Sequence, residues 1–446
     1  LRLTVNHEFS DKLNIGATFN YTKTIGDMIA QGQSDQNVYM MLLNIPNDIP
    51  IKELEDLNNK FNQPQNYFGY YYPNPYYALA NNKTTNNVDR FLTSVNIEYK
   101  PLEWLTFTGR FGADIYTDSR FQRFKKYAFV NRDSSGLRSF IGKYSEDIYT
   151  VNQYNADITV RAAHTFKTDY SIGAMVGFSL FHNKEKNTFA ETSGLVLDDF
   201  YSLSNSADRP TLTNALFMKR ILGVYADVTF GYKNYLFVDL TARNDWSSTL
   251  PKDQRSYFYP GVSASLVFSD LIKQFTTLDP MGLSYGKIRA SFAVIGKDAE
   301  PYQLKNVFST GDINDGYPMT DIKSPYVSST GNQLAGYSLS SVLRNPTLKP
   351  EISNSWEIGT DLSFLKDRLN IEFTYYSKLS KNQIVTVPVA PSTGYENRII
   401  NAGTFSNKGI ELAVRVTPVS LKNGFKWEVY GTFTKNYSKV IKVADN

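Results

Sequence analysis

Residues 150–166, with the sequence TVNQYNADITVRAAHTF, alternate between apolar and polar side chains over most of their length. One face carries Tyr154, Ala156, Ile158, Val160 and Ala162, and the other carries Asn155, Asp157, Thr159 and Arg161. A period of two predicts a β-strand with one apolar and one polar face. The segment is longer than the roughly five or six residues usual in strands of soluble proteins. It is also long enough for a tilted membrane-crossing strand, which needs roughly 9–11 residues.

The same alternation recurs along the chain and predicts 14 strands, near 1–9, 13–22, 88–99, 104–116, 150–166, 170–181, 218–231, 235–245, 257–268, 287–296, 353–364, 369–378, 408–417 and 424–437. Short polar turns, as at 10–12, 100–103, 167–169, 232–234 and 366–368, alternate with long segments at 23–87, 117–149, 182–217, 297–352 and 379–407. A modest loop after 235–245 and a longer turn at 269–286 complete the series, and residues 51–61 suggest a short helix inside a loop. This arrangement predicts an all-β fold, a transmembrane antiparallel up-and-down β-barrel with short periplasmic turns and long extracellular loops.

Composition supports a membrane barrel and excludes several other classes. The 446 residues carry a net charge of +4 and contain no Cys and three His, which disfavours nucleic-acid binding, disulfide scaffolds and thiolate chemistry. No stretch approaches the roughly 18 consecutive apolar residues of a spanning helix. Aromatic residues flank the short turns on the apolar register, as an interfacial girdle would: Tyr99, Trp104, Phe166, Tyr170, Phe230, Tyr235, Phe268 and Phe364. A soluble all-β protein stays open as the alternative, because its strands also alternate.

The sequence contains none of the common catalytic or nucleotide-binding motifs. We therefore expect no enzyme activity, no cofactor and no metal site. An alternative is an outer-membrane hydrolase centred on His182, which we place at the mouth of a loop that also contains Asp198 and Asp199. The Asx-rich segment at 312–316 has clustered oxygen ligands but lacks the downstream Glu of a calcium loop, so we interpret it as a turn.

A tyrosine-rich segment at 66–77 is the most distinctive part of the long connections. Its candidate substrate-binding residues are Tyr67, Tyr70, Tyr71, Tyr72, Tyr76 and Tyr77. A tyrosine combines a rigid apolar face with a polar tip, which suits stacking on sugar rings or hydrogen bonding along a peptide. The alternative is that these side chains pack the loop against its neighbours or a partner protein, and the sequence leaves both open.

Four runs in the second half carry a family resemblance. They are RNDWSSTLP at 243–251 with YFYP at 257–260, KIRASF at 287–292, NPTLKPE at 345–351 with Trp356 and Glu357, and NKGIE at 407–411. In this order the runs resemble the SusC/RagA family of TonB-dependent outer-membrane transporters. We interpret their residues as structural markers of that family rather than ligands: Arg243, Asp245, Ser247, Ser248, Pro260, Asn345, Pro346, Pro350, Glu357 and Gly409.

The resemblance implies a 22-stranded barrel with an N-terminal plug, in the outer membrane of a Gram-negative cell of the Bacteroidetes type. Such proteins import glycans or peptides beneath a SusD-like surface lipoprotein, and an inner-membrane TonB complex acts on the plug. With 14 predicted strands, no signal peptide, no plug and no TonB box, residues 1–446 correspond to a partial barrel domain, and we expect the plug and the terminal strands outside this chain. The expected partners are the lipoprotein, the TonB complex through the absent plug, and outer-membrane lipids. An alternative role is a structural scaffold in a larger outer-membrane assembly.

Overall fold

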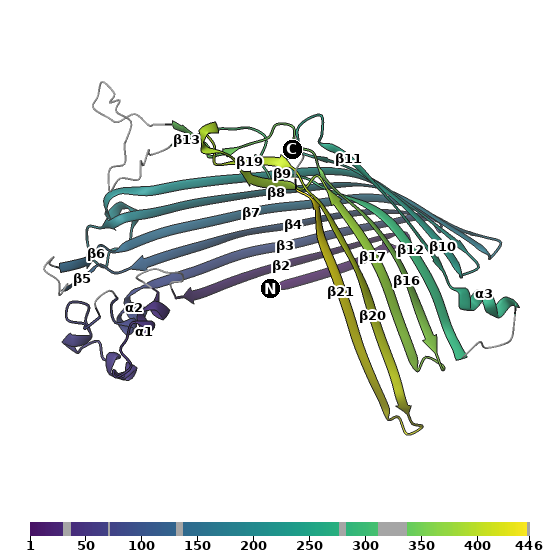
Figure 1. Ribbon diagram of the computed structural model, residues 1–446, viewed down its shortest axis with the longest axis horizontal. Coiled ribbons are helices and arrows are strands. Elements are labelled where there is room, and N and C mark those ends of the chain that lie inside the picture. Colours follow the sequence, from purple (N-terminus) through teal and green to yellow (C-terminus); the bar gives the residue numbers. More distant parts are fainter. Residues whose placement is uncertain (30–36, 70–71, 131–136, 276–281, 311–336, 444–446) are drawn as a thin grey trace.

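The computed structural model describes residues 1–29, 37–69, 72–130, 137–275, 282–310 and 337–443, and its main feature is one curved sheet of 14 strands (Figure 1). Each strand pairs antiparallel with its neighbours in chain order. The strands are β1 (Arg2–Ser10), β2 (Leu13–Met28), β3 (Lys83–Leu102), β4 (Leu105–Phe124), β7 (Lys143–Phe166), β8 (Tyr170–Leu195), β9 (Ser206–Tyr232), β10 (Leu236–Ser247), β11 (Ser256–Leu266), β12 (Leu283–Lys297), β16 (Glu351–Phe364), β17 (Leu369–Lys381), β20 (Thr404–Ser420) and β21 (Lys426–Lys442). The prediction of an up-and-down antiparallel sheet is confirmed.

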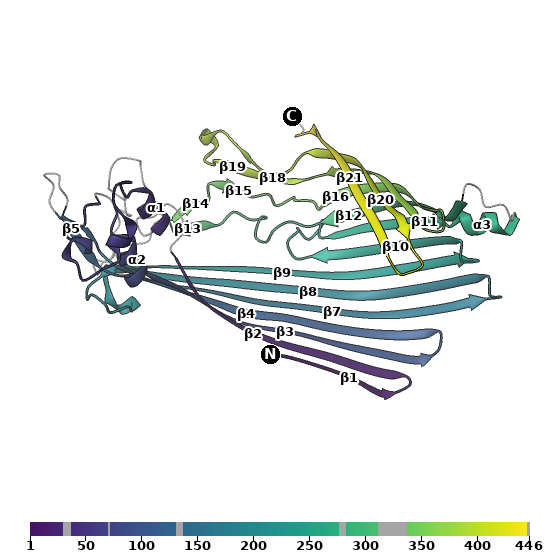
Figure 2. The ribbon, with the colours of Figure 1, turned by 90° about the horizontal axis from the view of Figure 1, so that it is seen from below.

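Short and long connections lie at opposite ends of the sheet. The turns that follow β1, β3, β7 and β9 gather at one end with the helix α3 (Phe268–Phe275), whereas the long connections gather at the other end (Figure 2). The order of strands runs from β1 to β21, and Figure 2 shows these two edge strands on opposite sides of the view. The described sheet is therefore an open, curved wall.

The connections contain small elements of their own. They are the helices α1 (Val38–Leu43) and α2 (Pro75–Asn81), the 3-10 turns η1 (Ile51–Leu54), η2 (Lys60–Asn62), η3 (Leu203–Asn205) and η5 (Pro391–Thr393), the hairpins β5 (Tyr127–Val130) with β6 (Leu137–Phe140) and β13 (Phe308–Thr310) with β14 (Tyr337–Leu339), and a sheet of β15 (Val342–Leu343), β19 (Asn397–Asn401) and β18 (Ile384–Pro388). The segment at 312–316 lies outside the described residues.

The prediction of one short helix at 51–61 is wrong, because the segment forms η1 and η2 instead. Side chains between them compete for the backbone: Asp56 Oδ1 accepts a hydrogen bond from the Asn58 amide at 3.0 Å, and Asn59 Oδ1 accepts one from the Phe61 amide at 3.1 Å. Such local bonds replace the ladder of a continuous helix. Phe268 was expected on a strand, but it begins α3, and its ring packs where a side chain on Gly286 would otherwise lie.

Several strands extend well beyond their predicted ends. β7, β8 and β9 have 24, 26 and 27 residues, so the connection between β8 and β9 covers only 196–205 instead of 182–217. Within the extension of β8, Lys184, Glu185 and Lys186 are consecutive polar residues, although Lys184 still pairs with Met218 of β9. Where both faces of a sheet meet water, the hydrogen-bonded ladder continues although apolar and polar residues no longer alternate. Sequence analysis detects only the alternation, so it misses such parts of a strand.

The two faces of the sheet differ as the alternation predicts. Apolar side chains of one face stand exposed on the described wall, with Ile158 61% and Val176 57% accessible. Aromatic pairs lie on this face beside the short turns, with ring centroids 6.3 Å apart for Tyr99 and Phe107 and also for Tyr170 and Phe230. A lipid-facing surface of a barrel has this apolar band and aromatic border. Among the described helices, none has the length and apolar character needed to span a membrane.

Candidate functional site

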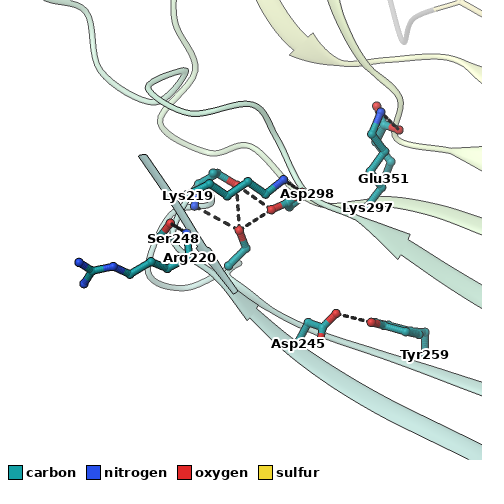
Figure 3. A network of polar contacts seen from close by, with 10 residues as sticks. Lys219, Arg220, Asp245, Ser248, Tyr259, Lys297, Asp298 and Glu351 are labelled. Atoms are coloured by element: carbon teal, nitrogen blue, oxygen red, sulfur yellow. Dashed lines mark hydrogen bonds and ion pairs between the residues drawn. The ribbon is translucent and has the colours of Figure 1, made fainter. Parts of the chain in front are cut away.

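The polar face of β8, β9 and β10 carries a connected cluster built around Arg243. Its guanidinium Nε donates to Asp245 Oδ1 at 2.8 Å, and its Nη2 donates to Ser179 Oγ at 2.8 Å. The guanidinium also lies over the ring of Tyr225, 5.3 Å from the centroid. The Tyr259 hydroxyl donates to Asp245 from β11 (Figure 3). Two family-motif residues, Arg243 and Asp245, thus form one ion pair that ties four neighbouring strands together.

This cluster requires the absence of a side chain at Gly223. Gly223 lies opposite both Ser179 and Asp245 in the ladder. A Cβ at Gly223 would lie 2.4 Å from Arg243 Nη2 and 2.4 Å from Asp245 Oδ1. The guanidinium can cross the strand only because this position is glycine.

A second polar cluster lies at the end of the same strands, around the buried carboxylate of Asp298. Ser247 donates to Asp298 Oδ2 at 2.5 Å, and Thr249 donates to the same atom at 3.2 Å. Lys219 Nζ donates to Asp298 Oδ1 at 2.7 Å (Figure 3). The motif residue Ser247 therefore fixes the start of the loop after β12, in which Asp298 lies. Ser248 fixes the backbone beside it, since its hydroxyl accepts from the Arg220 amide at 2.9 Å.

The NPTLKPE run fixes the long connection between β12 and β16. Asn345 Oδ1 accepts from the amide and hydroxyl of Thr347, at 2.9 and 2.8 Å, so Pro346 lies inside an Asx turn. Leu348 is fully buried, in a cluster with Leu250, Tyr257, Ala299 and Ile399. Pro350 leads directly into β16. The buried cluster joins the connections after β10, β12 and β17, which are far apart in sequence.

The remaining motif residues occupy the wall itself. Pro260 lies in β11 at the last position before pairing with β12 begins at Gly261, where its missing amide donor is tolerated. Glu357 is exposed on the polar face of β16. A Cβ at Gly409 would lie 2.5 Å from the Tyr376 hydroxyl oxygen and 2.7 Å from the Lys435 carbonyl oxygen, so the tyrosine ring crosses the backbone there.

The tyrosine-rich segment is only partly brought together. Tyr70 and Tyr71 lie outside the described residues. Tyr67, Tyr72 and Tyr76 are partly exposed, and burial raises the pKa of Tyr67 to about 12. Tyr77 is buried in a cluster with Tyr127, Leu57 and Phe140, and its ring meets Tyr127 edge-on at 5.9 Å. For Tyr77 the contacts favour the packing alternative, whereas the other three described tyrosines retain an accessible face.

Asn74 holds this segment in place and was not singled out from the sequence. Its side chain is fully buried and donates from Nδ2 to the carbonyl oxygens of Leu54 at 2.8 Å and Asn62 at 3.1 Å. Its Oδ1 accepts from the Tyr76 amide at 3.0 Å, which caps α2. An asparagine directly before a proline and a helical run is the signal that marks this cap.

The structure does not assemble the hydrolase site. His182 lies inside β8 rather than at the mouth of a loop, because β8 continues to Leu195. Its Nδ1 accepts from Arg220 Nε at 3.1 Å, and its ring stacks on Tyr154 at 6.1 Å. Asp198 and Asp199 lie beyond the end of the strand, where Asp199 pairs with Lys125 at 2.7 Å. His182 thus lacks the carboxylate partner that the hydrolase alternative needs.

A further polar groove of about 310 Å³ lies on the face of the sheet that carries Arg243. Arg90 donates from Nε to Asp114 Oδ1 at 2.8 Å, and its guanidinium lies 5.5 Å from the centre of the Tyr116 ring. Glu185 accepts from Asn183 at 2.7 Å and from Tyr149. Paired charges and hydrogen-bonded carboxylates characterise this face, as a wet barrel interior requires. Within the described residues no group of three or more Asp, Glu or His side chains is arranged to hold a metal ion.

Comparisons with known proteins agree with this architecture. A family model described as "TonB dependent receptor-like, beta-barrel" matches residues 41–446. The chain belongs to this family. TonB-dependent receptor P26 of Formosa agariphila is 24% identical over 448 residues, which is 99% of this chain and 42% of the relative. TonB-dependent receptor SusC of Bacteroides thetaiotaomicron is 22% identical over 376 residues, covering 83% of this chain and 35% of the relative.

Among solved structures, the RagAB peptide transporter matches with a TM-score of 0.78 at 18% identity, covering 99% of this chain and 46% of that chain. The resemblance to SusC and RagA is thereby confirmed, and this likeness shows the fold. The chain spans less than half the length of the curated relatives it matches. The family consists of outer-membrane receptors and transporters, and enzyme activity is not its general property.

Proposed function

We propose that the protein containing this chain is a SusC-like importer of an oligomeric nutrient, a glycan or a peptide, in the outer membrane of a Bacteroidetes-type cell. A SusD-like lipoprotein would close over the extracellular loops, and a TonB complex would act on a plug outside this chain. The sheet described here would form the wall of the path and the base of its extracellular entrance.

The observation that carries the proposal is the continuous polar face of the sheet. It holds ion pairs from β3 to β12, among them Arg90 with Asp114 and Arg243 with Asp245, while the opposite face is apolar and exposed. A closed barrel with this arrangement has lipid outside and a polar interior. The fold is shared with a transporter whose name states that its cargo is a peptide, which supports an oligomeric cargo.

The partly exposed Tyr67, Tyr72 and Tyr76 are the candidate cargo contacts, together with Tyr70 and Tyr71 outside the described residues. Aromatic rings with polar tips provide area at low entropic cost, and they suit sugar rings and peptide side chains alike. Tyr77 belongs to the loop core instead.

The first test is purification of the natively expressed full-length complex in mild detergent, followed by mass spectrometry of its proteins and bound small molecules. A stoichiometric SusD-like lipoprotein and a bound glycan or peptide support the importer. Recovery with assembly or secretion components and without a small-molecule ligand favours the scaffold role and contradicts import.

A further inference from the structure

A groove lies on the apolar face of the sheet, on the side opposite the polar face that the import proposal uses. Its volume is about 730 Å³, and it is lined by Tyr154, Leu180, His182, Arg220, Leu222, Trp246, Ser247, Ser248 and Arg255. These residues form two rows across the sheet. Tyr154, His182 and Arg220 are ladder partners in one row, and Leu180, Leu222 and Trp246 are partners in the next.

The orientation of Arg220 places its charge on the lipid side of the wall. Consecutive residues of a strand point to opposite faces. Lys219 reaches Asp298 on the polar side, and Figure 3 shows the Arg220 side chain extending the other way. Below Arg220 the same face of β9 continues with Leu222, Val224 and Val228, each exposed on the wall.

The height of the groove coincides with the upper border of the apolar band. His182 lies 12 residues beyond Tyr170, the first residue of β8 after its short turn. At about 3.3 Å per residue and a tilt of about 45°, this distance corresponds to a rise of about 28 Å. The apolar band of such barrels is about 25 Å tall, and Trp and Tyr collect at its borders. Trp246 and Tyr154 therefore lie at the outer interface, with the short-turn aromatics at the inner one.

The upper side of the groove is positive and lacks counter-ions. Arg220 donates from Nε to His182, and Arg255 lies in the connection after β10. In the part of the chain that the structure describes, neither guanidinium has a carboxylate within 4.0 Å, in contrast to Lys23 of the same face, which is 3.4 Å from Asp89. The charges that act on His182 are the cations of Arg220 and Lys184. An unpaired cation pair above an apolar floor is complementary to an anionic amphiphile.

We propose that this groove binds a phosphate-bearing lipid of the outer leaflet of the membrane. The phosphate lies beside Arg220 and Arg255, and an acyl chain lies along Leu180, Leu222 and Trp246. The apolar floor favours a lipid over a free anion, because a soluble phosphate would leave these side chains uncovered. This inference rests on the outer-membrane location of the family and is independent of the imported cargo.

The test uses the purified, delipidated full-length protein and native mass spectrometry. Three probes are titrated: lipid A with its phosphates, the same glycolipid without phosphates, and inorganic phosphate. We expect one tight lipid A molecule per protein and weaker binding of the dephosphorylated form. Removing both guanidinium charges in the Arg220→Gln, Arg255→Gln double variant should weaken lipid A binding about 25-fold, at roughly fivefold for each cation near a membrane surface.

Lys23→Gln is the matched control, because Lys23 lies on the same face but is already paired with Asp89. It should bind lipid A as the wild type does. The proposal is refuted if the double variant binds lipid A unchanged, if the dephosphorylated lipid binds equally well, or if inorganic phosphate alone binds as tightly as lipid A. A native complex without a lipid adduct, in which a protein partner cross-links to this groove, also refutes it. If the double variant fails to fold, Arg255→Gln alone decides, since a roughly fivefold loss is still expected.

Discussion

Replacement of Leu348 by alanine should open the connections after β10, β12 and β17 that pack together around this side chain. Leu348 is 0% exposed and packs with Leu250, Tyr257, Ala299 and Ile399. These partners come from β11 and from three separate connections, so Leu348 is the point at which they meet. Truncating a buried leucine to alanine costs about 2–5 kcal/mol, through lost burial and the cavity left behind.

The expected result is local opening rather than loss of the sheet. Two amides report it: Lys349 N donates to Asn401 Oδ1 at 2.8 Å, and Ala402 N donates to the Gln383 carbonyl at 2.8 Å. A loss of about 2 kcal/mol raises the open population about 30-fold, and amide exchange limited by opening should accelerate by the same factor. Hydrogen exchange with mass spectrometry on the full-length protein measures this change, while peptides from β16 and β17 should exchange as in the wild type.

Leu339→Ala is the matched control, because Leu339 lies in the same connection but is 50% exposed. It should leave exchange at Lys349 and Ala402 unchanged. Exchange that is equally slow in Leu348→Ala and the wild type would contradict the view that this side chain joins the connections. Acceleration throughout β16 and β17 would show that the cluster supports the sheet itself.

Three further predictions concern single polar or glycine positions. Asp298→Ala removes the partner of Lys219 and should destabilise the protein by about 1–3 kcal/mol, read from the guanidinium unfolding midpoint. Replacing Lys219 by Met as well should recover only part of this loss, because Ser247 and Thr249 also donate to Asp298. Gly409→Ala should destabilise the protein by about 1–3 kcal/mol and so reduce the amount of folded protein in the membrane. Adding Tyr376→Ala to this variant should restore only part of that amount, because the Lys435 carbonyl oxygen still lies 2.7 Å from the new Cβ. Full restoration would contradict the contact with Lys435. Burial raises the pKa of Tyr67 from 10.0 to about 12, so the stability that Tyr67 gives its loop is complete below pH 10 and is lost as the pH rises towards 12. In an absorbance titration at 295 nm, the Tyr67→Phe variant should lack one phenol that titrates late in the wild type. Loss of a phenol that titrates near pH 10 would contradict the burial of Tyr67.

Sequence alternation was sufficient to predict the sheet only where a strand crosses the bilayer. The 14 strands and their order were predicted because lipid on one side and a polar interior on the other impose a period of two. About half of β8 and of β9, and residues 143–149 of β7, were missed, since residues such as Lys184, Glu185 and Lys186 meet water on both faces. α3 was missed as well, although Ser269 and Asp270 before Leu271 form an N-terminal helix signal.

The candidate sites show a similar division. Arg243 and Asp245 lie on one face of one strand, where their spacing allows them to meet, and they form an ion pair at 2.8 Å. The roles of Leu348 and Asp298 depend on contacts between connections distant in sequence, which no local pattern encodes. The groove at Arg220 was missed because His182, its partner in the ladder, lies just past the predicted end of β8.

Strand length gives the extracellular side of this wall two levels. β10 and β11 have 12 and 11 residues, close to the roughly 9–11 that a crossing needs, whereas β7, β8 and β9 continue for as many residues again. The small sheet of β15, β18 and β19 therefore lies over the middle of the wall, while α1, α2 and β5 lie at its far end (Figures 1 and 2). On the proposed import path, a cargo molecule approaching from outside meets the Tyr67 and Tyr77 segment first and the Leu348 cluster afterwards. Variants of the exposed tyrosines should accordingly change capture, and variants of the Leu348 cluster should change passage once the cargo is bound.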